Sequence, residues 1–203
     1  MGSDFDNIRE SMKSQFTQVY VAVIVIFLVG VVFGQTGQEQ GKQAPPMSEM
    51  GVPRQIKLLS DMTGTWKTQM KYKIDQSQPA WSEAGGEAKY EYVLDNCGII
   101  GHYSMDLMGM PYKGMLIISY SRALAKYQSY WLDNMATAPI VDDGVRDSSG
   151  AVMFTGSEIY QGKTVYTRMT QRMPDKKTLV MEFEDSYDGK TYHRSMEILH
   201  TKQ

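Results

Sequence analysis

The chain has 203 residues, with 21 Lys or Arg against 23 Asp or Glu, and its formal net charge is −2 at pH 7. Charge so close to balance, without a basic stripe, argues against nucleic acid and against electrostatic attachment to anionic membranes. The single cysteine, Cys97, excludes an intramolecular disulfide. We expect Cys97 to be a small buried side chain rather than a nucleophile.

Residues 1–34 contain an uncharged apolar run at 19–33. This run is shorter than the roughly 20 residues of a membrane-spanning helix and has the length of a signal-peptide core. The small Gly34 suits cleavage, whereas the acidic residues near Met1 do not suit a signal peptide unless translation begins at Met12. The sequence therefore predicts an exported protein, periplasmic or secreted. The alternative is an uncleaved segment that anchors the chain to a membrane.

Residues 35–52 are rich in Gln, Gly and Pro and have no periodic apolar residues. Such a segment buries too little apolar surface to offset the entropy of ordering it, so we expect a disordered linker. Residues 53–203 then have the usual size of a single domain with one hydrophobic core.

This domain begins with a possible short helix over 54–60 and continues with segments that alternate polar and apolar residues, as strands do. Turn signals such as Asp188-Gly189 separate these segments. Consecutive hairpins without a long crossover predict an all-β, antiparallel, up-and-down barrel of about 8–10 strands. The expected strands cover 64–74, 86–94, 99–108, 112–120, 126–134, 151–160, 164–173, 178–186 and 191–200.

Two motifs carry a family resemblance. Gly64-Thr65-Trp66 opens the first strand, and Gly109-Met-Pro-Tyr-Lys-Gly114 begins a longer pattern that continues through Tyr127, Ser129, Trp131 and Asp133. From about Arg54 to Lys202 the chain resembles an uncharacterised, mostly bacterial domain-of-unknown-function family of the calycin (lipocalin-like) superfamily. The resemblance implies a lipocalin-like β-barrel, with Gly64 and Trp66 in structural roles at its closed floor. It implies little about function, because one fold hosts many functions.

The candidate ligand-binding residues come mainly from the strand 126–134. Side chains alternate between the two faces of a strand, so Tyr127, Ser129, Trp131 and Asp133 share one face. This mixture of aromatic, hydroxyl and carboxylate groups suits the wall of a semi-polar cavity, although Trp131 in a dry core is an equal alternative. Met135 joins the set because methionine fits adaptable apolar pockets.

Arg168 in the strand 164–173 has two interpretations. The first places it on a solvated outer face, as antiparallel strands usually alternate. The second turns Arg168 and Tyr166 inward to hold a carboxylate. With Asp133 or Glu182 nearby, such a pair could support a lyase or an isomerase that acts on a small carboxylic acid.

The three histidines, His102, His193 and His200, lack the spacing of a zinc site, and the sequence predicts no metal, no cofactor and no catalytic residue. Asp142, Asp143 and the acidic cluster at 182–185 have the character of solvated turns and strand ends. His200 lies late in the chain, like the iron ligand of one haem-binding branch of similar barrels, but we expect it to have a structural partner.

The function predicted from the sequence is binding of a small apolar or amphipathic ligand, with a carboxylate or another polar head, inside the barrel. The first alternative is the small-acid lyase or isomerase. The second is a filled structural barrel that acts as a protein-interaction module. The membrane enters this prediction only through the N-terminal segment, if that segment is not cleaved.

Overall fold

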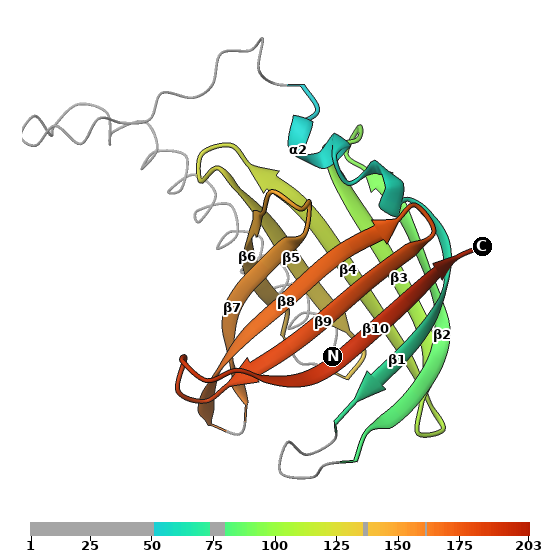
Figure 1. Ribbon diagram of the computed structural model, residues 1–203, viewed down its shortest axis with the longest axis vertical. Helices are drawn as coiled ribbons and strands as arrows, with labels where there is room; N and C mark the ends of the chain where they lie inside the picture. Colours follow the sequence, from blue (N-terminus) through green and yellow to red (C-terminus); the bar gives the residue numbers. More distant parts are fainter. Residues whose placement is uncertain (1–50, 74–79, 136–137, 161) are drawn as a thin grey trace, which may run out of the picture. The chain divides into compact units, whose positions relative to one another are not determined.

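The computed structural model describes residues 51–73, 80–135, 138–160 and 162–203, which Figure 1 draws in colour. The predictions for 1–34, and for nearly all of the linker, lie outside these residues. No helix in the described part of the chain combines the length and the apolar character that crossing a membrane requires.

Antiparallel strands form a closed, lipocalin-like barrel in which each strand pairs with the next along the chain, and the last pairs with the first (Figure 1). The predicted all-β up-and-down barrel is confirmed. Its strands are β1 (Gly64–Tyr72), β2 (Ser82–Val93), β3 (Gly98–Leu107), β4 (Met110–Ser121), β5 (Lys126–Asp133), β6 (Ile140–Arg146), β7 (Val152–Tyr160), β8 (Lys163–Asp175), β9 (Thr178–Ser186) and β10 (His193–Lys202).

Strand β6 was not predicted, because its sequence Ile-Val-Asp-Asp-Gly-Val-Arg reads as a turn. The glycine has a packing role here. A Cβ at Gly144 would lie 2.5 Å from the Phe154 ring on β7, so only glycine leaves room for that ring. Asp142 is buried and Asp143 is partly buried, and both lie within the strand. The prediction that these two acids form a solvated turn is therefore wrong.

A short helical segment covers one end of the barrel (Figure 1). It consists of α2 (Arg54–Lys57) and the 3-10 turn η2 (Ser60–Met62). Ile56, Leu59 and Met62 recur every three residues and are all buried, so this segment turns one apolar side toward the barrel. We call this end the covered end and the opposite end the open end.

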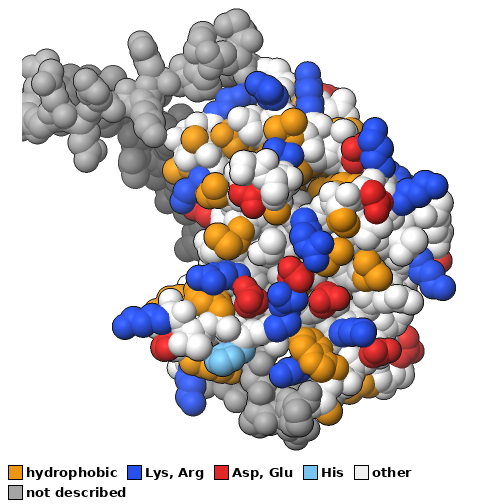
Figure 2. All heavy atoms as spheres, in the orientation of Figure 1, with side chains coloured by type: hydrophobic (Ala, Val, Ile, Leu, Met, Phe, Trp, Pro, Cys, Tyr) orange, Lys and Arg blue, Asp and Glu red, His pale blue; other side chains and the backbone are white. Residues whose placement is uncertain are grey.

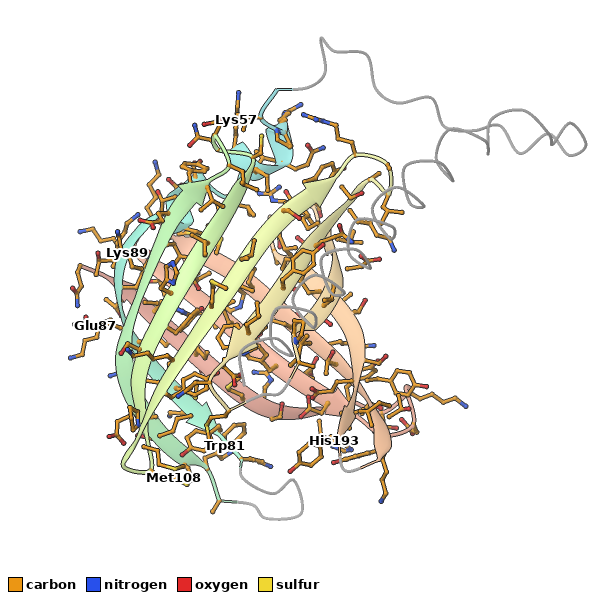
Figure 3. The ribbon with its side chains drawn as sticks, turned by 180° about the vertical axis from the view of Figure 1, so that it is seen from behind. Lys57, Trp81, Glu87, Lys89, Met108 and His193 are labelled. Atoms are coloured by element: carbon orange, nitrogen blue, oxygen red, sulfur yellow. The ribbon has the colours of Figure 1, made fainter. Side chains whose placement is uncertain are left out.

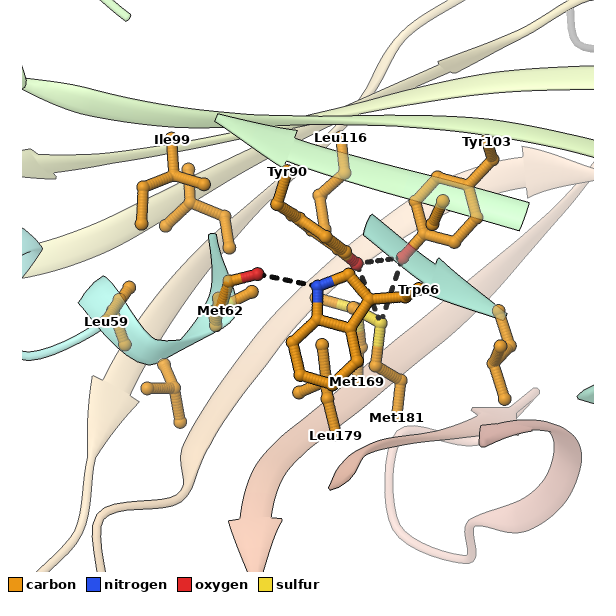
Figure 4. Packing of buried hydrophobic residues seen from close by; sticks show 14 of the residues in the cluster. Leu59, Met62, Trp66, Tyr90, Ile99, Tyr103, Leu116, Met169, Leu179 and Met181 are labelled. Carbon is orange, nitrogen blue, oxygen red and sulfur yellow. Dashed lines mark hydrogen bonds between the residues drawn. The ribbon is translucent and has the colours of Figure 1, made fainter. Parts of the chain in front are cut away.

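The Trp66 side chain lies directly beneath the helical segment. It is fully buried, and its indole Nε1 donates a hydrogen bond to the Met62 carbonyl at 2.8 Å (Figure 4). The Lys202 Nζ lies 5.1 Å from the centre of the Trp66 ring. Gly64 has φ +126°, a backbone conformation that side-chain-bearing residues rarely adopt. These contacts fix the helical segment to the start of β1 and the end of β10.

Large side chains fill the covered half of the barrel. Tyr90, Ile99, Ile118, Phe154 and Leu179 are all at most 1% exposed. Figure 4 shows several of the core side chains converging beneath Met62 and around Trp66. A hollow of about 430 Å³ lies at this end, between the helical segment and exposed residues such as Arg146, Ser149 and Arg172. The candidate site inside the barrel therefore lies toward the open end.

The outer surface carries charges of both signs. Figure 2 shows Lys or Arg and Asp or Glu side chains intermixed on the face formed by β8, β9 and β10. Glu182 accepts from Arg194 at 2.8 Å and lies 3.8 Å from Arg172. These side chains are partly exposed, and ion pairs on such a solvated face contribute little to stability.

Replacing Trp66 with Phe should lower the free energy of unfolding by about 2–4 kcal/mol, because a cavity forms and the buried Met62 carbonyl loses its donor. Urea denaturation measures this change. Trp81→Phe is the matched control, since Trp81 is 41% exposed, and its effect should stay within about 0.5 kcal/mol. Equal effects of the two substitutions would contradict a structural role for Trp66.

Candidate ligand-binding site

A cavity of about 270 Å³ lies inside the open half of the barrel, bordered by residues of β1 and of β4 to β10. A larger hollow of about 560 Å³ lies over β1 to β5, but exposed side chains such as Glu87, Lys89 and His102 border it. Ligand sites usually enclose most of the surface of a small molecule. The internal cavity is therefore the candidate site.

Apolar side chains form much of the cavity wall. Leu116, Met169 and Ile198 are almost fully buried, and Phe183 and Met196 pack against the same core. They come from β4, β8, β9 and β10, so the apolar surface spans the barrel from wall to wall. This part of the cavity suits a hydrocarbon or aromatic group.

Trp131 forms an aromatic wall whose orientation is fixed by Asp133. The Trp131 indole donates to the Asp133 Oδ2 at 2.8 Å, and the Tyr112 hydroxyl donates to the same oxygen at 3.1 Å. The other oxygen, Oδ1, accepts from the Met135 backbone N–H at 2.8 Å. Burial and the neighbouring Asp133 carboxylate raise the pKa of the Tyr112 phenol, so Tyr112 stays a hydrogen-bond donor.

Asp142, Glu158 and Asp185 place three more carboxyl groups on the cavity wall, from β6, β7 and β9. Asp142 is 8% exposed, and its carboxylate occupies the space that a Cβ at Gly156 would take. Thr167 donates to the Asp142 Oδ1 at 3.4 Å, which is a long hydrogen bond. Only glycine at position 156 leaves space for the Asp142 carboxylate against β7.

Burial shifts the titration of all three of these acids. It raises the pKa of Asp142 to about 6, with smaller contributions in the same direction from Glu158 and Asp143. Burial, together with Asp185 and Asp133, raises the pKa of Glu158. Burial also raises the pKa of Asp185, against a hydrogen bond from Ser195. The cavity therefore disfavours negative charge that no cation balances.

Among the described residues that line the cavity, the only basic one is Arg168. Its neighbours Thr167 and Met169 are on the inward face of β8, so the Arg168 side chain is on the outward face. There its guanidinium carbon lies 3.6 Å from the centre of the Tyr192 ring. The interpretation that turns Arg168 inward is wrong. Tyr166 is 39% exposed on the same outer face, so the inward pair that the lyase alternative needs is not formed.

The other predicted residues separate into two groups. Ser129, Trp131 and Asp133 line the cavity. Tyr127 also points inward, but it lies at the covered end, where its hydroxyl donates to the Gln55 carbonyl at 3.0 Å. Met135 follows the end of β5, is 55% exposed and is not among the residues that line the cavity.

Sequence reasoning missed the inward positions of Asp142, Glu158 and Asp185. Strand parity could have found two of them, because Glu158 shares a face with Phe154 and Asp185 shares a face with Phe183. The prediction that the acidic cluster at 182–185 is solvated is wrong for Asp185. Within the described part of the chain, no three acidic, His or Cys side chains gather closely enough to hold a metal ion.

His200 lies between the cavity and the covered end, in a buried network with two tyrosines. Its Nδ1 lies 3.2 Å from the Leu179 carbonyl, which can only accept, so Nδ1 carries the proton. Nε2 then accepts from the Tyr103 hydroxyl at 3.1 Å, and Tyr103 and Tyr90 share a hydrogen bond. Both ring nitrogens are occupied, which leaves His200 without a free nitrogen for iron.

Comparison with known proteins identifies the family. Residues 53–202 match the family described as "Protein of unknown function (DUF1579)", and the chain belongs to it. No curated protein matches the sequence.

Solved structures share the barrel at low sequence identity. Rv2717c from M. tuberculosis has a TM-score of 0.52 at 11% identity, over 75% of this chain and 99% of that one. The S-type phycobiliprotein lyase CPES from Guillardia theta has a TM-score of 0.48 at 9% identity, over 72% and 91%. A de novo designed fluorescence-activating β-barrel has a TM-score of 0.38 at 15% identity, over 70% and 93%. The similarity to Rv2717c supports the lipocalin-like fold, but it does not indicate a function.

The buried His200 should make stability depend on pH. Burial lowers its pKa from 6.5 to about 4, so between these values the unfolded chain binds a proton that the folded chain does not. Stability therefore falls as pH decreases from about 6.5 to about 4, by up to about 1.4 kcal/mol per pH unit. The advantage of the wild type over His200→Gln in urea denaturation should shrink in this window. A difference that stays constant from pH 7 to pH 4 would contradict the assignment.

Proposed function

We propose that this protein is an exported small-molecule-binding protein whose barrel holds a ligand with an apolar body and a positively charged head. The observation that carries the proposal is the cavity itself. It is apolar in its depth, it has Asp142, Glu158 and Asp185 on its wall, and no Lys or Arg side chain of the described residues points into it.

The charge of the ligand follows from the cost of the buried acids. A carboxylate removed from water needs a compensating cation or several hydrogen-bond donors. Asp133 has such donors in Trp131 and Tyr112. Within the described part of the chain, Asp142 has only the long hydrogen bond from Thr167, so an ammonium group near it would replace the lost solvation. This sign is the reverse of the carboxylate head that the sequence suggested, because Arg168 is outside the barrel.

The apolar wall and the volume of the cavity determine the size and the polarity of the ligand body. A cavity of about 270 Å³ is close to the lower limit of roughly 300 Å³ for pockets that take drug-sized molecules. Leu116, Met169 and Phe183 offer apolar contact, and the Trp131 ring can face a cation. A small amine with a hydrocarbon or aromatic body fits both features.

The proposal that the protein is exported rests on the sequence alone. The apolar run at 19–33 has the length of a signal-peptide core, and Gly34 gives a small residue for cleavage. Export would bring the barrel into contact with molecules outside the cytoplasm.

Three probes with the same tail test the sign of the head group: hexylammonium, hexanol and hexanoate. We expect calorimetric titration to give the highest affinity for hexylammonium, a lower affinity for hexanol and the lowest for hexanoate. Asp142→Asn, which keeps the shape of the side chain, should lower the affinity for hexylammonium about tenfold, the effect of losing one charge-assisted contact of about 1.4 kcal/mol. The affinity for hexanol should not fall.

Asp143→Asn is the matched control, because Asp143 is the next residue on β6 and pairs with Lys126 at 3.1 Å on the outer face. It should leave all three affinities unchanged. Tighter binding of hexanoate than of hexylammonium would refute a cationic ligand. If no probe binds, native mass spectrometry of the protein purified from its own cells would show whether it holds a different molecule.

Binding of hexylammonium should weaken in acid. The pKa of Asp142 is about 6, so protonation at pH 5 removes the charge that attracts the ammonium group. The amine itself stays protonated, since alkylammonium groups such as that of lysine have a pKa of about 10.4. Affinity should therefore fall about fivefold between pH 7.5 and pH 5, because about a tenth of the Asp142 side chains is still ionised at pH 5. Hexanol should show no such loss, and equal pH profiles for the two probes would contradict this role of Asp142.

A further inference from the structure

The open end of the barrel carries large exposed apolar side chains on or directly beside each of its five strand connections. Figure 3 shows two of them, Trp81 and Met108, at the end of the barrel away from Lys57 on the helical segment. We call this set the rim. Its described members are Trp81, Met108, Met110, Met135, Ile159, Tyr160 and Tyr187.

The covered end carries fewer exposed large apolar side chains, Leu58, Leu94, Leu124 and Val145, and none of them is aromatic. The described connections there between β6 and β7 and between β8 and β9 consist of polar residues, Gly and Ala, at 147–151 and 176–177. Apolar side chains that are exposed singly are common on proteins, but a group of them at one site marks an interaction surface. The rim surrounds the end of the barrel that holds the cavity.

Met108 forms the turn between β3 and β4 at the open end. It has φ +55°, a left-handed conformation in which Asn, Asp and Gly are favoured, and it is 62% exposed. Leu94 has the same combination at the covered end, so this conformation does not by itself distinguish the rim. The rim is distinguished by the number of its exposed apolar side chains and by its aromatic members.

The chemistry of the rim fits a lipid–water interface. Trp and Tyr are typical of such interfaces because their rings are apolar at one end and polar at the other. The Lys73 Nζ lies 5.2 Å from the centre of the Trp81 ring. Lys163, at the start of β8, and Lys190, in the connection between β9 and β10, are exposed at the same end. No ion pair among the described residues involves these three lysines, so each can approach a lipid phosphate.

We infer that the rim docks on the surface of a lipid bilayer and turns the open end of the barrel toward the membrane. The contact is made by apolar and aromatic side chains with three local lysines, which is consistent with the lack of a basic stripe in the chain as a whole. The sequence suggests a membrane contact only through the N-terminal segment, if that segment is not cleaved. The rim contact does not need that segment, and it fixes the orientation of the barrel. This inference does not depend on which ligand the cavity binds.

The test places a fluorescent label on one cysteine at a time in the full chain, with Cys97 replaced by Ala. The labelled positions are Met108 and Tyr187 on the rim, and Leu94 at the covered end. Leu94 is the matched control, because it is also a turn residue with positive φ, 52°, and it is 79% exposed. The vesicles contain phosphatidylcholine with brominated acyl chains, which quench a label that enters the bilayer.

We expect quenching at Met108→Cys and Tyr187→Cys that is several-fold greater than at Leu94→Cys. Adding Met108→Asn should reduce the quenching of the label at 187, whereas adding Leu94→Asn should not. Asn is favoured at positive φ, so neither substitution should impair folding. Equal quenching at both ends, or quenching at Leu94 alone, would overturn the proposal. Rim labels that respond to protein concentration but not to brominated lipid would overturn it in favour of self-association.

Discussion

The rest of the structure depends on the contact between Trp66 and the helical segment that covers the barrel. A closed sheet leaves two openings, and a barrel this size needs large side chains or a cover to exclude water from its core. The hydrogen bond from the Trp66 indole to the Met62 carbonyl ties the cover to β1. Because the large side chains gather beneath it, the opposite half contains small or polar inward residues such as Ser129 and Gly156, and space for a cavity remains there.

The two halves of the barrel respond to protons in opposite directions. His200, in the filled half, has a lowered pKa, so folding there is favoured when the histidine stays neutral. Asp142, in the open half, has a raised pKa, so the empty cavity is favoured when this acid binds a proton. At neutral pH His200 is in its favoured neutral form, whereas Asp142 is mostly ionised, which burial disfavours. An enclosed carboxylate that lacks compensation at neutral pH is a feature of binding and catalytic sites, where stability is given up for function.

The sequence predicted the barrel because hairpin turns and strand periodicity are local signals. Asp188-Gly189 and the alternation around Trp66 could be read without knowing any partner strand. The cavity is not local. Side chains alternate along β8, so a shift of one residue would turn Arg168 from the outer face to the inner face. The bulge between Arg172 and Asp175 interrupts this alternation, so it cannot be followed through the whole strand from the sequence. β6 was missed for a related reason, because Asp142 and Gly144 look like a turn until their neighbours Gly156 and Phe154 are known.

Three acids on the cavity wall are exceptions to the usual alternation of apolar and charged residues along a strand. Antiparallel strands usually place apolar residues inward and charged ones outward, and Arg168, Arg172 and Glu184 follow that rule. Asp142, Glu158 and Asp185 break it, and they do so on three strands that border one cavity. A single inward acid could be an accident of packing, but three acids that border one cavity raise the cost of negative charge there, because Glu158 is coupled to both Asp142 and Asp185. The departure from the local rule is thus the strongest indication of what the cavity is built to hold.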